Sequence, residues 1–302
     1  MRSAVRSILF MLAGLFAAPG AQAQYQVAEP PEDLRRELKL GAFYRKSVIV
    51  DGLPILASGK TSDYAVREAA YLVDRMLAGR ADLRQALVQN KVRVAVMAPE
   101  EFTTAVPEHS DLRPEVYWNK RARGLGATRA RPAVSCGEEN LLQHPGDPYR
   151  GENILIHEFG HAIHEMALRE VDQQFDGRLA AAFDQALRDG LWKGTYAATN
   201  RAEYWAEGVQ SWFDCNQGPD SQHNQVNTRA RLRDYDPRLA KLLAEVFRDN
   251  DWRYAPPARR PDAAHLRGYD AAKAPRFVWP PELVRAYEAL EAPKRKSPPA
   301  SK

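Results

Sequence analysis

Two histidines four positions apart are the first residues in this sequence whose types and spacing could do chemistry. Residues 157–161 read His-Glu-Phe-Gly-His, inside a run from Glu152 to Leu168 that has helical periodicity. Residues four apart share one face of an α-helix, so His157 and His161 can present imidazole nitrogens to one ion. Glu158 would stand beside that ion, where a carboxylate can take a proton from activated water. The pattern predicts a zinc site with an adjacent general base.

The rest of this helix would hold the histidines in place. Four apolar residues recur at helical spacing along it, on a stripe separate from the histidines: Leu155, Phe159, Ala162 and Met166. A stripe of this kind fixes a helix against a core and would leave the histidine face free to line a cavity. The competing interpretation is an ordinary helix in which two histidines happen to share a face.

A catalytic zinc needs three protein ligands and one position open to water, so a third ligand is expected downstream. Residues 200–207 read Asn-Arg-Ala-Glu-Tyr-Trp-Ala-Glu and predict a helix capped by Asn200. Glu203 and Glu207 would share one face, where one carboxylate could bind zinc while the other holds a ligand histidine in its tautomer. The alternative is that both glutamates lie on a solvated face, although Trp205, Val209 and Trp212 predict that the helix is half-buried.

His164 is an alternative third ligand, because it extends the histidine face by one more turn. Ligands spread from His157 to His164 would span about 10 Å at 1.5 Å per residue. Zinc–nitrogen bonds of about 2 Å cannot close over that distance. We therefore expect His164 behind the ligands or in the core.

With His-Glu-Phe-Gly-His at 157–161 and Glu-Tyr-Trp-Ala-Glu at 203–207, the chain resembles the gluzincins, zinc peptidases whose third ligand is a glutamate. Within that group it resembles the catalytic domain of anthrax lethal factor and its relatives, which include the secreted Pro-Pro endopeptidases. The resemblance implies one Zn²⁺ ion, a peptide or protein substrate, Glu203 as ligand and Glu207 as its neighbour behind the metal. It also implies that Tyr196, seven positions before Glu203, donates its hydroxyl to the developing oxyanion.

The elements around these motifs predict an α+β fold. We expect a zincin-like arrangement in which a mixed β-sheet N-terminal part packs on a helical C-terminal part, with the zinc cleft between them. Strands are expected near 47–56, 92–97 and 133–142, and helices near 63–79, 152–168, 171–189, 200–215 and 237–249.

The segment 133–142 precedes the zinc helix as an edge strand does in zincins, where it pairs with an extended substrate. Its Glu138 and Glu139 would then favour basic substrate residues. The plainer alternative is a solvated acidic turn.

Residues 1–23 have the three parts of a signal peptide: Arg2 and Arg6, an apolar run at 8–18, and Ala21-Gln22-Ala23. The run is shorter than the roughly 20 residues that cross a bilayer. We expect cleavage after Ala23, a secreted or periplasmic protein, and no stable membrane insertion. Further boundaries are expected as follows: a flexible lead-in at 24–40, the metallopeptidase domain at 41–290 and a disordered basic tail at 291–302.

Export would place Cys136 and Cys215 in an oxidising compartment, where an even number of cysteines usually pairs. We expect a Cys136–Cys215 disulfide, which would tie the strand to the end of the Glu203 helix. The alternatives are two buried thiols or a thiolate metal ligand.

The composition fits a globular protein, since 44% of the 302 residues are hydrophobic and 27% are charged. The 43 basic and 39 acidic residues are interspersed, so no nucleic-acid partner is expected. The favoured function is an exported zinc-dependent metalloendopeptidase. Two alternatives stay open: a cell-wall amide hydrolase with the same site, and a non-catalytic cell-envelope binding module whose fourth ligand would be Cys215, His164 or His223.

Overall fold

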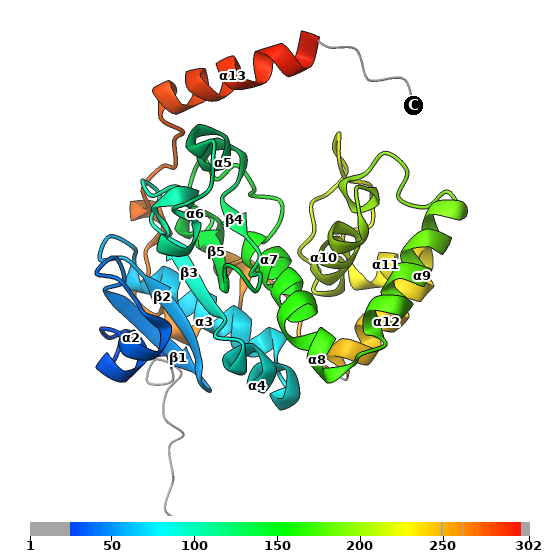
Figure 1. Cartoon of the computed structure of the whole chain (residues 1–302), viewed down its shortest axis with the longest axis horizontal. Helices are drawn as coiled ribbons and strands as arrows, with labels where there is room; N and C mark the ends of the chain where they lie inside the picture. Colours follow the sequence, from blue (N-terminus) through cyan, green and yellow to red (C-terminus); the bar gives the residue numbers. More distant parts are fainter. Residues whose placement is uncertain (1–24, 249, 262, 297–302) are drawn as a thin grey trace, which may run out of the picture.

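The computed structural model describes residues 25–296, apart from positions 249 and 262. The expected signal segment and residues 297–302 of the expected tail lie outside these described residues. A mixed five-stranded sheet has the order β1-β2-β3-β5-β4 (Figure 1). Its strands are β1 (Lys46–Val50), β2 (Leu53–Ala57), β3 (Arg93–Met97), β4 (Gly124–Leu125) and β5 (Ala133–Gly137).

The three inner strands of the sheet are parallel, and the strand at each edge is antiparallel to its neighbour. All residues of β2, β3 and β5 are buried, as expected for parallel strands covered on both faces. β1 and β2 are joined by Asp51-Gly52, both with positive φ, which suits a tight two-residue hairpin turn. The predicted α+β class with a mixed sheet is confirmed.

Helices cover the sheet and form a second group beyond it. The α-helices are α2 (Glu32–Leu38), α3 (Asp63–Met76), α4 (Ala81–Gln89), α5 (Glu115–Arg121), α6 (Glu138–Leu141), α7 (Ile154–Ile163), α8 (Arg169–Val171), α9 (Phe175–Arg188), α10 (Arg201–Trp212), α11 (Arg229–Tyr235), α12 (Pro237–Phe247) and α13 (Pro281–Lys296). A π-helical turn, His164–Leu168, follows α7 directly. In Figure 1, α7 runs between the sheet side of the molecule and the group formed by α9 to α12. None of the described helices combines the length and apolarity that a bilayer span requires.

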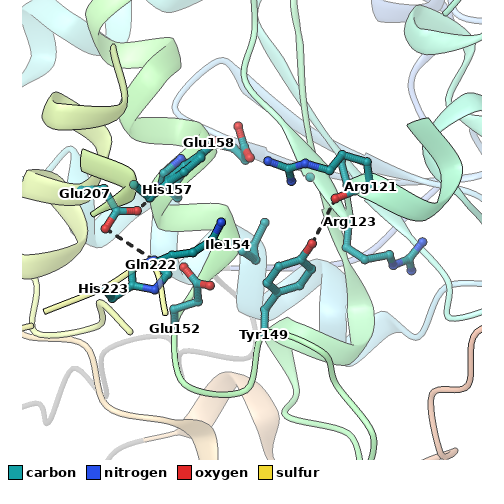
Figure 2. A pocket seen from close by; sticks show the side chains of 13 residues that line it. Arg121, Arg123, Tyr149, Glu152, Ile154, His157, Glu158, Glu207, Gln222 and His223 are labelled. Carbon is teal, nitrogen blue, oxygen red and sulfur yellow. Dashed lines mark hydrogen bonds and ion pairs between the residues drawn. The ribbon is translucent and has the colours of Figure 1, made fainter. Parts of the chain in front are cut away.

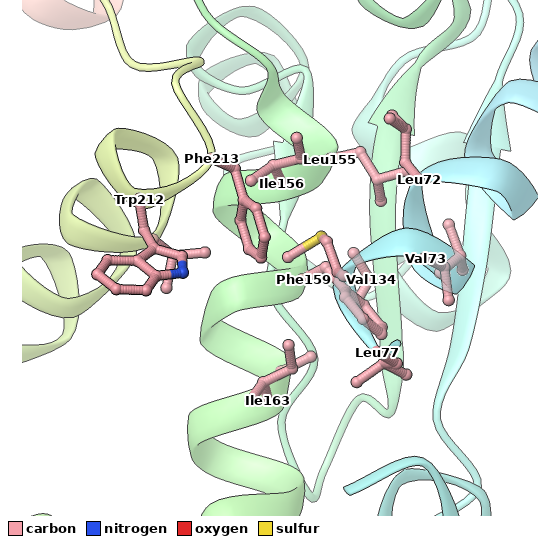
Figure 3. Packing of buried hydrophobic residues seen from close by; sticks show 14 of the residues in the cluster. Leu72, Val73, Leu77, Val134, Leu155, Ile156, Phe159, Ile163, Trp212 and Phe213 are labelled. Atoms are coloured by element: carbon pink, nitrogen blue, oxygen red, sulfur yellow. The ribbon is translucent and has the colours of Figure 1, made fainter. Parts of the chain in front are cut away.

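Helix α7 is held on both sides by one continuous apolar core. The stripe predicted along it is buried: Leu155, Phe159, Ala162 and Met166 are each at most 2% exposed. Residues of α3 and β5 pack on one side of α7, and residues near the end of α10 pack on the other (Figure 3). Burial of this stripe leaves the opposite face of α7 available for a site.

The prediction of a flexible lead-in at 24–40 is wrong for residues 25–40, the part that the structure describes. Tyr25 is buried and donates its hydroxyl to Asp74 at 2.9 Å, and Ala28 pairs with Ser47 of β1. Residues 32–38 form α2. These long-range contacts order the segment. Its Pro- and charge-rich composition does not reveal them, because they involve residues distant in the sequence. The tail expected from 291 is likewise helical as far as Lys296, at the end of α13.

The expected edge strand at 133–142 is also wrong. β5 ends at Gly137 and lies inside the sheet, and Glu138–Leu141 forms α6. The edge is β4, Gly124–Leu125, which pairs with β5 in the antiparallel direction. Glu139 is buried in a salt bridge with Arg123, and Glu138 is buried and accepts a hydrogen bond from the Ser62 amide. Neither carboxylate is part of an exposed acidic turn or of a substrate edge.

The expected disulfide does not form, because Cys136 and Cys215 are both free and buried. Cys136 lies in β5, whereas Cys215 follows α10 and donates its thiol to the carbonyl of Gln210. Helix α7 packs against both β5 and α10. The end of α10 is tied to the start of α7 through the backbone, since the Asn153 amide donates to the Cys215 carbonyl at 3.1 Å.

Candidate metal centre

His157, His161 and Glu203 converge on one point from two helices. Nε2 of His157 lies 3.2 Å from Nε2 of His161, and Oε2 of Glu203 lies 3.1 Å from the first nitrogen and 3.3 Å from the second. Ligand atoms at adjacent corners of a tetrahedron with bonds of about 2.0 Å are about 3.3 Å apart. The three atoms therefore form the face of a tetrahedron of zinc size, and they are the one such group of metal-ligating side chains in the described part of the chain.

The close approach of α7 and α10 sets this triangle. Asn153 caps α7 by accepting from the Ile156 amide, and Asn200 caps α10 as predicted, accepting from the amides of Ala202 and Glu203. The indole of Trp205 donates to the Gly160 carbonyl at 2.9 Å, so a buried hydrogen bond joins the two helices.

Gly160, between the two histidines, makes that approach possible. A Cβ atom there would already lie 3.3 Å from the side chain of Val209 on α10. A larger residue would push α10, and Glu203 with it, away from the histidines.

Gln210 holds the ring of His157. Its amide oxygen lies 2.8 Å from Nδ1 of His157, and its amide nitrogen donates to Oε2 of Glu152 at 2.9 Å and to the Asn153 carbonyl at 3.3 Å. Because the amide nitrogen is used by these acceptors, the amide oxygen faces Nδ1 and takes its proton. The lone pair of Nε2 is then left pointing at the ligand triangle.

Sequence reasoning missed Gln210 and gave this position to Glu207. The nearest carboxylate oxygen of Glu207 lies 3.7 Å from Nδ1 of His157, and its other oxygen accepts from Asn216 at 3.0 Å. Glu207 therefore lies near His157 but is not its hydrogen-bond partner. The available signal was spacing, since Gln210 lies seven positions after Glu203 and so on the same face of α10.

The carboxylates around the triangle favour a positive charge there. Burial alone would lower the pKa of His157, but the hydrogen bond to Glu203 and the charges of Glu158 and Glu207 raise it to about 10. Burial would raise the pKa of Glu203, but its hydrogen bonds to His157 and His161 lower it. The raised pKa of His157 shows that the surrounding carboxylates attract positive charge. A divalent cation would be attracted more strongly than a proton.

Glu158 is half-buried and lines the cavity beside the triangle. Burial raises its pKa above the ordinary value, and the neighbouring histidines act in the opposite direction. A carboxylate with a raised pKa is a better proton acceptor at neutral pH, which is what general-base chemistry needs.

Tyr196 lies in a 3-10 turn, Tyr196–Ala198, directly before α10. Its ring centre is 6.3 Å from that of His157, and its amide donates to the Gln222 carbonyl at 2.7 Å. Burial and the charge of Glu203 raise the pKa of its hydroxyl to about 12, so the phenol stays protonated and can donate. The side chain of Arg121, which lines the same cleft, is close enough for its charge to act against this rise in pKa.

A cleft of about 490 Å³ opens over the triangle. One wall is α5 with β4 and the residues that follow it, the floor is α7, and the other wall carries Tyr196 and Glu203. β4 and the residue after it lie directly on α7, because a Cβ atom at Gly126 would be 2.8 Å from Cβ of His161 and one at Gly124 would be 3.0 Å from Cγ of Glu158. These two glycines allow an edge strand to pass within reach of the candidate ligands and base.

A smaller polar pocket of about 90 Å³ continues from the cleft past Glu158 (Figure 2). Figure 2 shows Arg121 on one side of it and Glu207 and His223 on the other. Arg121 lines both this pocket and the cleft, so it stands at their junction.

The three residues considered as a fourth ligand all lie in other interactions. His164 bonds Asp176 through Nε2 at 2.6 Å, Cys215 bonds the Gln210 carbonyl, and His223 bonds Asp220 at 2.9 Å. His164 is thus a core residue, as its spacing predicted. In the described residues the triangle offers three candidate protein ligands and faces an open cleft.

No protein-family model matches this chain, and no curated protein matches it. Among solved structures, the chain is similar to the Pro-Pro endopeptidase (PPEP-2) from Paenibacillus alvei. The two share 19% sequence identity, with 66% of this chain and 98% of that chain covered and a TM-score of 0.39. At this distance the likeness carries no functional conclusion, so the function proposed below rests on the site itself.

Proposed function

We propose that this chain is an exported zinc-dependent metalloendopeptidase with a zincin-like fold and a gluzincin ligand set. The observation that carries the proposal is the triangle of His157 Nε2, His161 Nε2 and Glu203 Oε2, with separations of 3.1–3.3 Å, facing an open cleft that also holds Glu158. Two imidazoles, one carboxylate and an open position are a donor set typical of catalytic zinc.

Zn²⁺ bound there would supply Lewis acidity, polarising a carbonyl and activating water for attack. Glu158 receives the proton that the water loses and can pass it to the leaving amine, because its raised pKa suits both directions. Tyr196 donates its hydroxyl to the oxygen that gains negative charge. The glycine-flanked edge strand β4 would pair with the backbone of an extended peptide and bring the scissile bond over α7.

Export is proposed from the sequence of residues 1–23. It would place the site in a secreted or periplasmic protein acting on peptide or protein substrates. It would also expose the two cysteines to an oxidising compartment, where their burial protects them from reaction.

The proposal is tested by Glu158→Gln, which keeps the side-chain volume and removes the base. Zinc content after dialysis should stay at one ion per chain, while hydrolysis of an unfolded protein substrate should fall about 100-fold or more. Glu170→Gln, which changes the same charge on α8 away from the cleft, is the matched control and should keep full activity. Full activity of Glu158→Gln, or no zinc bound by the unaltered chain, would contradict the proposal.

A further inference from the structure

Arg121 is the last residue of α5 and stands where the cleft meets the polar pocket. Arg121 is exposed and lines both cavities together with Tyr196, and its carbonyl accepts a hydrogen bond from the Tyr149 hydroxyl at 3.2 Å. Figure 2 shows its guanidinium directed along the pocket toward Glu158. The group thus lies beside the residues proposed to carry out hydrolysis.

Within the described chain, Arg121 forms no salt bridge. Glu158 is near enough for the charge of Arg121 to lower its pKa, yet the two side chains are not within ion-pair distance. Two neighbouring charged groups are already paired: Arg123 with Glu139, and Glu165, on the cleft floor, with Arg169. Arg121 is therefore a cation that lines the cleft and has no ion-pair partner among the described residues.

A guanidinium carries five N–H donors in a planar fork. A carboxylate matches this fork through two parallel hydrogen bonds. Such a ligand would lie beside Glu158 and Tyr196, next to the bond being cleaved.

We propose that Arg121 selects peptides that carry a carboxylate next to the cleaved bond: an acidic side chain where the enzyme cleaves within a chain, or the free C-terminus where it acts instead as a carboxypeptidase. This inference rests on the proposed function and names its substrate class. The sequence suggested that Glu138 and Glu139 would favour basic substrate residues, and this inference gives the opposite preference. Glu138 and Glu139 are buried in internal contacts, whereas Arg121 faces the cleft.

The experiment measures peptide binding to the zinc-loaded full chain carrying Glu158→Gln, so that binding is read without cleavage. The probes are fluorescently labelled octapeptides of Gly, Ala and Pro that hold Glu or Gln at one position at a time. A second pair differs only in a free or amidated C-terminus, which separates the two sources of carboxylate. Binding is followed by fluorescence anisotropy in the parent and after adding Arg121→Gln, Arg121→Lys or Arg121→Glu.

At one position, or at the C-terminus, the carboxylate peptide should bind about tenfold more tightly than its neutral twin. Arg121→Gln should abolish this ratio, Arg121→Lys should keep part of it, and Arg121→Glu should reverse it in favour of the neutral twin. Arg188→Gln, an exposed arginine of α9 outside the cleft, should leave the ratio unchanged. A purely structural effect through Tyr196 would weaken both twins equally.

Equal binding of both twins, a preference that survives in Arg121→Gln, or no binding of any acidic peptide would overturn the inference. Failure of the proposed function would look different. In that case the unaltered chain would hydrolyse no peptide, even if an Arg121-dependent preference for carboxylate peptides were measured.

Discussion

The amide oxygen of Gln210 lies 2.8 Å from Nδ1 of His157, and this contact decides which nitrogen of the imidazole faces the candidate metal site. Gln210 is itself fixed, because its amide nitrogen donates to Glu152 and to the backbone at the start of α7. The ligand histidine is thus oriented by a neutral amide that bridges α10 and α7. A carboxylate, Glu207, stands further away at 3.7 Å.

Replacing Gln210 with Ala should lower zinc affinity about 10- to 100-fold, since the ring of His157 loses the acceptor that holds it. Competition with a chelator of known affinity measures this change. Glu207→Gln should lower zinc affinity less, and Gln185→Ala, on the surface of α9, should leave it unchanged. If Glu207→Gln proved more damaging than the Gln210 variant, the carboxylate rather than the amide would hold His157.

Replacing Tyr196 with Phe should lower kcat about 100-fold, because one oxyanion donor is removed while the ring stays in place. Zinc affinity and peptide binding should stay near those of the unaltered chain, since the Tyr196 hydroxyl is not part of the ligand triangle. Steady-state kinetics and zinc titration measure the two effects separately. A variant with unchanged kcat would remove Tyr196 from the mechanism.

Replacing Gly126 with Ala should weaken zinc binding and hydrolysis together. The added methyl would lie 2.8 Å from Cβ of His161, so either the strand or the histidine has to move. Gly177→Ala in α9 is the matched control, because no atom lies within 4 Å of its Cβ position. It should leave zinc affinity intact and not lower stability. Normal zinc binding by Gly126→Ala would show that β4 does not press on the site.

Glu138 should make stability depend on pH. Burial, with a smaller contribution from Glu139 and Glu100, raises its pKa from 4.5 to about 7, despite the hydrogen bond from the Ser62 amide. The fold thus favours the protonated form of Glu138. The stability that this protonated form contributes is complete below pH 4.5 and is lost as the pH rises through 7.

The free energy of unfolding of Glu138→Gln, compared with that of the unaltered chain, should therefore rise by about 2–3 kcal/mol from pH 5 to pH 8. Urea unfolding at both pH values measures the gain, with Glu37→Gln on the surface of α2 as control. A constant difference between variant and parent across this range would show that Glu138 is ionised in the fold at pH 5.

The residues that form the candidate site follow from local spacing. His157 and His161 share a helix face, Asn200 caps the helix that carries Glu203, and the stripe through Leu155 is buried, because helix periodicity alone sets which residues face together. The convergence of the two helices was expected from the resemblance. Its geometry depends on Gly160 and Trp205, whose contact is long-range.

Where the sequence prediction was wrong, a contact distant in the chain decided the outcome. Glu138 and Glu139 look like a solvated turn or a substrate edge, but the amide of Ser62 and the guanidinium of Arg123 bury them. Cys136 and Cys215 satisfy the even-number rule for a disulfide, but α7 packs against both segments and the thiols stay free.

By itself, the sequence determined the candidate ligands, the candidate base and the apolar faces, because these depend on residues within a few helical turns of one another. Only the tertiary structure decided which strand lies at the edge, which side chain holds His157 and which charge faces the cleft. Those outcomes depend on close approach between segments tens of residues apart, and neither composition nor periodicity records such an approach.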